Sequence, residues 1–152
     1  MFTGELFGQE GVTVKTHNKR PDWSNEDELS ARSTREVIED HIQLQVTGQL
    51  DEDLHRNYDA DAVLLTETGD FSGYAAWCRH VGSLYRPAEG AYYEIESLQV
   101  RDDYAFLIWK AGSSGYVVDG ATDSFVVVNG KIRMQTTRVR VMHSDAGVAN
   151  AG

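Results

Sequence analysis

His41 and Asp123 are the two residues of this 152-residue chain whose types and surroundings best suit acid–base chemistry. His41 lies on the apolar stripe of a predicted helix, and an imidazole with an ordinary pKa of about 6.5 can move a proton near neutral pH. Asp123 opens the run DSFVVV and shares strand parity with Phe125 and Val127, so we predict that it points inward. An apolar setting disfavours the charged carboxylate and raises its pKa. Asp123 would then act as a general acid or a hydrogen-bond donor.

These two positions suggest a dyad in which Asp123 orients the imidazole of His41, which moves a proton in a bound small molecule. Each residue also has a plainer interpretation. His41 would be a satisfied core histidine, and Asp123 would bond to backbone or a neighbouring side chain, or lie at an exposed strand end. Two classes of function therefore stay open. One is a non-catalytic protein that binds a small apolar ligand or serves as a dimeric assembly domain, and the other is a cofactor-independent lyase, isomerase, cyclase or hydrolase.

Composition and motifs argue against several other classes of function. The net charge of -10 opposes binding to nucleic acid through its phosphates. The five histidines are scattered and no metal-ligand spacing occurs, so we predict no metal site and no cofactor. No apolar run approaches the roughly 20 residues of a membrane span. The segment MFTGELFGQEG lacks the pattern of a signal peptide and Cys78 is the single cysteine, so we expect a cytoplasmic location and no membrane partner.

The elements that must position these residues are marked by start and stop signals. The S-x-x-E spacing of a capping box begins a helix at Ser33, and Gly48 can end it. A second short helix, the strand AVLLTET, the turn GDFSG and a third helix ended by Pro87 are predicted to follow. Asn129-Gly130 indicates a type I′ hairpin. The remaining predicted elements are residues 74–86 for the third helix and residues 92–100, 104–111, 116–128 and 131–141 for four strands of an antiparallel meander.

Two of these strands carry apolar residues on both faces. Leu107 and Trp109 lie on one face, whereas Phe106 and Ile108 lie on the other. A sheet with one wet face alternates apolar and polar residues, so both faces are predicted to be covered. We expect a homodimer that packs sheet on sheet, with the N-terminal extension as the alternative cover. The predicted organisation is an extension at 1–32 that is weakly structured or draped on the body, a domain at 33–142 and a frayed tail at 143–152.

The order of these elements resembles that of the nuclear transport factor 2-like superfamily, in its SnoaL-like branch. The resemblance covers about residues 33–141 and includes YDADAVLLTETGDFSGYAAW, VRDDYAFLIWKA and DGATDSFVVVNGKIRMQT. It implies an α+β cone, in which a strongly curved, mostly antiparallel sheet wraps around about three N-terminal helices and leaves an apolar internal pocket. The superfamily includes ketosteroid isomerases, polyketide cyclases and non-catalytic binding domains, so the fold alone does not imply a function.

The resemblance also gives three positions to compare with the ketosteroid isomerases. His41 falls where they place a tyrosine that donates to the developing oxyanion, and Asp123 falls where they place a protonated aspartate. Thr66 stands where they have the aspartate that moves the proton, so ketosteroid isomerisation is not expected. Other residues suit a pocket lining, although the aromatic ones also suit a core and Gln135 also suits a bond to a neighbouring strand. The predicted ligand-binding residues are Tyr58, Thr66, Tyr93, Trp109 and Gln135.

Overall fold

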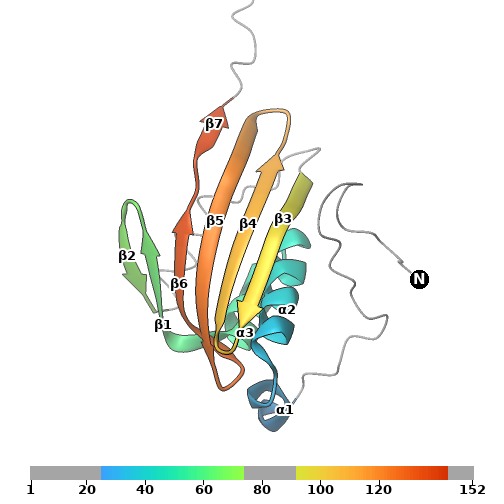
Figure 1. The fold of residues 1–152 in the computed structure, drawn as a ribbon, viewed down its shortest axis with the longest axis vertical. Helices are drawn as coiled ribbons and strands as arrows, with labels where there is room; N and C mark the ends of the chain where they lie inside the picture. The colour runs from blue at the N-terminus through green and yellow to red at the C-terminus, as the bar shows by residue number, and fades with distance from the viewer. Residues whose placement is uncertain (1–24, 74–91, 144–152) are drawn as a thin grey trace, which may run out of the picture.

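The computed structural model describes residues 25–73 and 92–143, and it consists of one long curved sheet with helices against one face (Figure 1). The described elements in chain order are α1 (Glu26–Ser30), α2 (Thr34–Val46), α3 (Leu50–Asn57), β1 (Tyr58–Thr66), β2 (Gly69–Ser72), β3 (Tyr92–Arg101), β4 (Tyr104–Gly112), β5 (Tyr116–Val128), β6 (Lys131–Arg138) and β7 (Val141–His143).

The strand order is β2-β1-β6-β5-β4-β3, with β7 paired to β5. Strands β3 to β6 form the predicted antiparallel meander, and β1 runs parallel to β6. The hairpin between β5 and β6 turns at Asn129 and Gly130, whose φ angles of 51° and 70° fit a type I′ turn. The α+β fold class predicted from the sequence is thereby confirmed.

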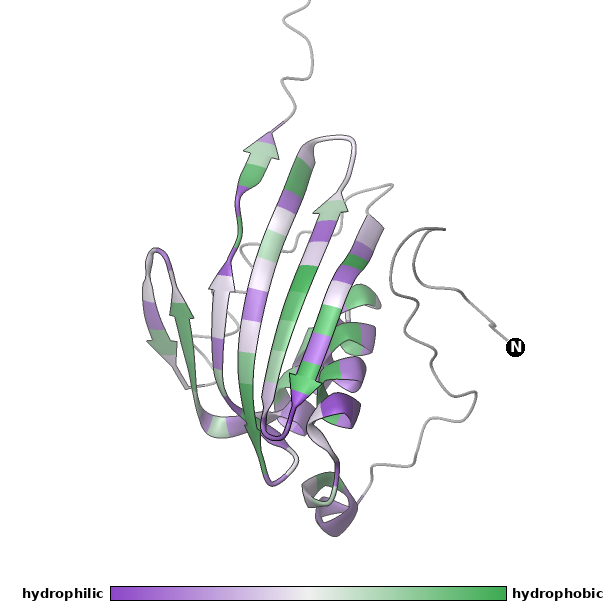
Figure 2. Ribbon diagram, in the orientation of Figure 1, coloured by the Kyte–Doolittle hydropathy of each residue, from purple (hydrophilic) through white to green (hydrophobic). Residues whose placement is uncertain are grey.

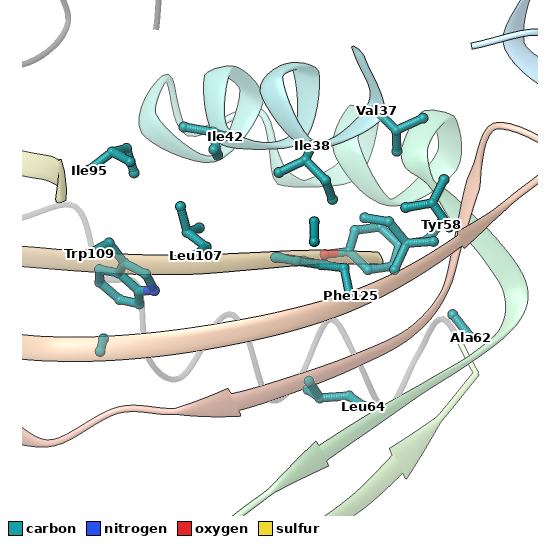
Figure 3. Close-up of a cluster of buried hydrophobic side chains, with 14 of the residues drawn as sticks. Val37, Ile38, Ile42, Tyr58, Ala62, Leu64, Ile95, Leu107, Trp109 and Phe125 are labelled. Carbon is teal, nitrogen blue, oxygen red and sulfur yellow. The ribbon is translucent and has the colours of Figure 1, made fainter. Parts of the chain in front are cut away.

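Helix α2 begins where the capping box predicts. The backbone N–H of Ser33 donates to Glu36 Oε2 at 2.8 Å, while the backbone N–H of Glu36 donates to Ser33 Oγ at 3.3 Å. These two bonds satisfy N–H groups that a helix start leaves without intrahelical partners. The helix then buries one apolar stripe against the sheet, and Figure 3 shows Ile38 and Ile42 facing strand residues such as Leu107.

The core is a single layer between the helices and the inward face of the sheet. Along β4 up to Ala111, and along β5 from Ala121 to Val127, every second residue is buried, as the alternation of Leu107, Trp109 and Phe125 with their more exposed neighbours shows. In Figure 2, apolar colours run along the middle of β4 and along the end of β5 that leads into the β5–β6 turn, whereas α1 is largely hydrophilic. This arrangement places any polar side chain on the inward face in a largely apolar layer.

Three sequence expectations need correction or lie outside the description. The segment GDFSG does not simply turn the chain, because Gly69–Ser72 forms β2 antiparallel to β1, and the turn lies at residues 67–68. The last predicted strand breaks after Arg138, and Val141–His143 pairs with β5 instead of continuing β6. The third predicted helix, at residues 74–86, lies outside the described residues.

The described part of the N-terminal extension packs on the body. Leu29 of α1 is buried, and the side chain of Arg32 donates to the backbone carbonyl of Gly130 at 2.8 Å. Arg32 thus ties the start of the described chain to the β5–β6 turn. Among the residues that the structure describes, no helix has the length and apolar character to cross a membrane.

Candidate active site

The sheet register brings Asp123 into a row of inward-facing side chains. Asp123 on β5 lies opposite Leu107 on β4 and Thr137 on β6. Phe125, two residues further along β5, lies opposite Gln135. Helix α2 crosses this face of the sheet, and its His41 ring lies edge-on to the Phe125 ring with centroids 5.5 Å apart. His41 and Asp123 therefore occupy the same buried layer, as their positions in the sequence predicted.

The carboxylate that hydrogen-bonds to His41 is Asp53 of α3, not Asp123. The distance from His41 Nδ1 to Asp53 Oδ2 is 2.8 Å, and Asp53 has no exposed surface. Gln45 Nε2 donates to the same oxygen at 2.7 Å. The predicted orienting role of Asp123 in a dyad thus belongs to Asp53. The sequence did carry a signal for this, because Asp53 follows Leu50 by three residues and therefore lies on the inward stripe of α3.

Asp123 is buried among few partners. Trp109 Nε1 donates to its Oδ2 at 3.0 Å, whereas its Oδ1 accepts no well-formed hydrogen bond from the part of the chain that the structure describes. Burial raises the pKa of Asp123, although Thr137 and Gln135 lie near enough to lower it in part, as does the charge of His41. Burial thus favours the protonated form of the Asp123 carboxyl group more than water does.

His41 sits between opposing influences on its pKa. Desolvation is the largest single one and lowers the pKa, but the charges of Asp53, Asp123 and Asp40, together with the Asp53 hydrogen bond, raise it above the ordinary value. Asp123 therefore acts on His41 through charge, and His41 acts on Asp123 in return. The pKa values of the two groups are therefore coupled.

Tyr58 and Gln135 complete the cluster. Tyr58 Oη donates to Gln135 Oε1 at 2.7 Å and lies 3.4 Å from His41 Nδ1. Because Gln135 Oε1 accepts this bond, its amide N–H groups remain to donate toward Asp123. Three of the five predicted ligand-binding residues, Tyr58, Trp109 and Gln135, are thus gathered around His41 and Asp123.

The other two predicted ligand-binding residues lie at the margins. Thr66 is opposite Thr137 in the sheet, but its hydroxyl donates to the Gly69 carbonyl in the β1–β2 turn at 3.0 Å. Tyr93 packs its ring 6.3 Å from the ring of Trp109, and burial, with a further contribution from Tyr116, raises its pKa to about 12. Tyr93 therefore supports Trp109 rather than touching His41 or Asp123 by any contact described.

A cavity of about 350 Å³ adjoins this cluster at the start of β1. Tyr58 belongs to both, since its ring lines the cavity and its hydroxyl bonds inside the cluster. Most of the lining is apolar, with a charged rim. The lining residues are Leu54, His55, Tyr58, Asp59, Ala60, Ala62, Gly73 and Lys131. Within the described ranges 25–73 and 92–143, no group of three or more His, Cys, Asp or Glu side chains is placed to hold a metal ion.

Several solved structures of nuclear transport factor 2-like proteins have a similar fold. One of unknown function from Burkholderia xenovorans is 21% identical, with 84% of this chain and 92% of that chain covered and a TM-score of 0.57. A proposed polyketide cyclase from Sinorhizobium meliloti is 20% identical over 67% of this chain and 93% of that one, with a TM-score of 0.57. A proposed ketosteroid isomerase from Kribbella flavida is 13% identical over 75% and 82%, with a TM-score of 0.59.

No protein-family model matches the chain, and no curated protein matches it. At these levels of identity the structural likeness concerns the fold. The chain has the nuclear transport factor 2-like fold, the α+β cone that its sequence resembles.

Proposed function

We propose that this protein binds a small, mostly apolar molecule between α2 and the inward face of the sheet, and catalyses a proton transfer in it without a cofactor. The observation that carries the proposal is the buried His41–Asp53 hydrogen bond beside Asp123, whose Oδ1 accepts no well-formed bond within the described residues. A base and an acid of raised pKa in one apolar layer are the groups that such chemistry needs.

The proposed mechanism uses the neutral form of His41 and the protonated form of Asp123, the form that burial favours. Neutral His41 takes a proton from a carbon or hydroxyl of the substrate and becomes an imidazolium that the Asp53 carboxylate stabilises. Protonated Asp123 donates a hydrogen bond to the substrate oxygen on which negative charge develops. His41 then returns the proton to another atom of the substrate or to a leaving group. This sequence of steps is available to isomerases, lyases and cyclases. Two of the proteins with a similar structure are a proposed polyketide cyclase and a proposed ketosteroid isomerase.

The first experiment is a thermal-shift screen of steroids, polyketides, terpenes and aromatic acids, followed by turnover assays on compounds that bind. A ligand of the folded state raises stability by RT ln(1 + [L]/Kd), so its effect must grow with dose. We expect His41→Gln and Asp123→Asn each to reduce turnover by about 10²- to 10⁴-fold, the usual contribution of a general acid or base. His143→Gln, which changes an exposed histidine at the end of β7, serves as the control. Unchanged turnover in both site variants would contradict the proposal.

The cavity favours a second candidate function, which is binding without turnover. Its apolar lining and its link to Tyr58 suit a hydrophobic small molecule held away from His41 and Asp123. In that case a compound would raise the melting temperature equally in the wild type and in both site variants.

We further propose that a second copy of the chain covers the outward face of the sheet, where Tyr104 and Phe106 are 62% and 37% exposed.

A further inference from the structure

We propose that Asn57, held in one orientation by Arg32, is a positioning residue that sets the tautomer of His41 through Asp53. The catalytic meaning of this inference rests on the function proposed above, but the arrangement itself stands on hydrogen bonds among four buried side chains. These bonds start in the segment between α1 and α2 and run across α3 to α2, through Arg32, Asn57, Asp53 and His41.

The first step is that Arg32 can only donate. Its guanidinium has donors and no acceptor, and its side chain has no exposed surface. Nη1 donates to Asn57 Oδ1 at 2.7 Å, and Nη2 donates to the backbone carbonyls of Arg56 and Gly130. The side-chain oxygen of Asn57 must therefore face Arg32, because an amide nitrogen in its place would meet another donor.

The second step is that Asn57 then presents its nitrogen to two carboxylates. Asn57 Nδ2 donates to Asp53 Oδ1 and to Asp40 Oδ2, each at 2.9 Å. Asn57 is completely buried, so the amide has no water in which to turn around. Asp40 is itself held by two bonds from Arg56, at 2.7 and 2.8 Å. The oxygen of the Asn57 amide is thus fixed by a donor, Arg32, and its nitrogen is fixed by two acceptors, Asp53 and Asp40.

The third step fixes Asp53. Its Oδ1 accepts an N–H from Asn57 and its Oδ2 accepts an N–H from Gln45, so both oxygens act as hydrogen-bond acceptors. A carboxylate can only accept, so the bond to His41 must carry its proton on Nδ1. In neutral His41 the other nitrogen, Nε2, is consequently the bare one. The chain of bonds that starts at Arg32 thereby selects Nε2 as the basic atom of the site.

The test reads the protonated nitrogen of His41 directly, by two-bond nitrogen–proton correlation in protein with ¹⁵N-labelled histidine, at a pH well above the His41 pKa. We expect Nδ1–H and bare Nε2 in the wild type. The isosteric Asp53→Asn variant should reverse this. Because Asn57 still offers its N–H, the new amide must turn its oxygen toward Asn57 and its nitrogen toward His41, so the ring proton moves to Nε2. Gln45 is only partly buried and can rotate away.

Asp51→Asn is the matched control, since it removes the same charge from an exposed position of the same helix and should leave the tautomer unchanged. A bare Nδ1 in the wild type would overturn the inference. Retention of Nδ1–H in Asp53→Asn would also overturn it, because Asn57 would then have turned around. If Asp53→Asn does not fold, Asp53→Ser replaces it. A hydroxyl can donate or accept, so this variant should produce a mixture of the two tautomers, and an unchanged spectrum would overturn the inference.

The outcome is independent of the proposed function, because no substrate is present. The expected tautomers without turnover of any compound would refute catalysis and leave the role of Asn57 intact. Turnover that depends on His41, combined with a bare Nδ1, would refute the role of Asn57 and support catalysis.

Discussion

Burial raises the pKa of Asp123, whereas its hydrogen bonds and the charge of His41 lower it, and the net rise affects the stability of the fold. The folded pKa of this group is raised above its unfolded value. Its protonated form therefore contributes stability that is present below the unfolded pKa, near 3.8, and is lost as the pH rises through the folded pKa. Above that pH the fold contains a buried carboxylate with one poorly paired oxygen, and such an acceptor costs about 1–3 kcal/mol.

We therefore expect Asp123→Asn to melt at a higher temperature than the wild type at pH 7, with an advantage that shrinks toward pH 4. The amide oxygen can still accept from Trp109, so the packing is kept. Melting followed by circular dichroism between pH 4 and 8 measures the difference. Asp119→Asn, an exposed aspartate on the same strand, controls for net charge. A difference that does not change with pH would show that Asp123 keeps an ordinary pKa.

His41 becomes positively charged when it binds a proton, whereas Asp123 becomes neutral, but protonation stabilises the fold in both cases because both pKa values are raised. Its folded pKa is raised, so its protonation stabilises the fold below the unfolded value of about 6.5, and this contribution is lost as the pH rises through the folded pKa. Asp53 contributes to the rise through both charge and a hydrogen bond, and Asp123 contributes through charge. Asp53→Asn should therefore lower the His41 pKa, and Asp123→Asn should lower it by less. Titration of the His41 Cε1–H proton resonance measures both, and the reverse order would contradict this assignment.

The residues of the site differ in how well the sequence predicted them. Strand parity was enough to place Asp123 on the inward face, and the apolar stripe of a helix was enough to bury His41. Asp53 was not predicted as its partner, because an acidic residue in the first turn of a helix has an ordinary explanation in the helix dipole. Which carboxylate meets His41 depends on how α2 packs on α3, and that is a non-local property.

At the scale of elements, the β5–β6 turn is fixed from outside as well as by its own sequence. Gly130 has a φ of 70°, which favours glycine, and a Cβ there would collide with the backbone carbonyl of Leu29 in α1. Gly120 has a similar φ of 61°, but a Cβ there would meet open space. The two glycines thus separate the cost of backbone conformation from the cost of the contact with α1.

We expect Gly120→Ala to lose about 1 kcal/mol of unfolding free energy, the usual cost of this backbone region for alanine. Gly130→Ala should lose distinctly more, because α1 must move and Arg32 loses its hold on the Gly130 carbonyl. Urea denaturation of both variants measures the difference. Equal losses would mean that α1 contributes little to holding the turn.

Elements whose signals are local were predicted well, and those that depend on distant pairing were not. The capping box at Ser33 and the Asn129-Gly130 turn act through neighbouring residues, so the sequence shows them directly. Strand β2 forms because Gly69–Ser72 pairs with β1, and β7 forms because Val141–His143 pairs with β5. The parallel pairing of β1 with β6 joins segments about 70 residues apart, and no local pattern specifies it.

At the scale of the whole molecule, the outward face of the sheet carries an apolar row that the described helices do not cover. Tyr104 on β4 lies opposite Val126 on β5, which lies opposite Met134 on β6, which lies opposite Val63 on β1. The next row contains Phe106 and Leu65, exposed by 37% and 44%. An apolar surface that continues across four strands favours a partner, and a second copy offers the same face for a symmetric contact.

The wild type is therefore expected to sediment as a dimer at micromolar concentration, and Phe106→Glu is expected to sediment as a monomer. A charge at the centre of this face would be buried without a partner if two copies met there. Arg35→Gln changes the net charge by the same amount at an exposed position on α2 and should remain dimeric. Circular dichroism of Phe106→Glu should match the wild type, because the side chain points away from the core. A monomeric wild type would instead leave the outward face to another segment or partner, whereas a dimeric Phe106→Glu would place the interface elsewhere on the molecule.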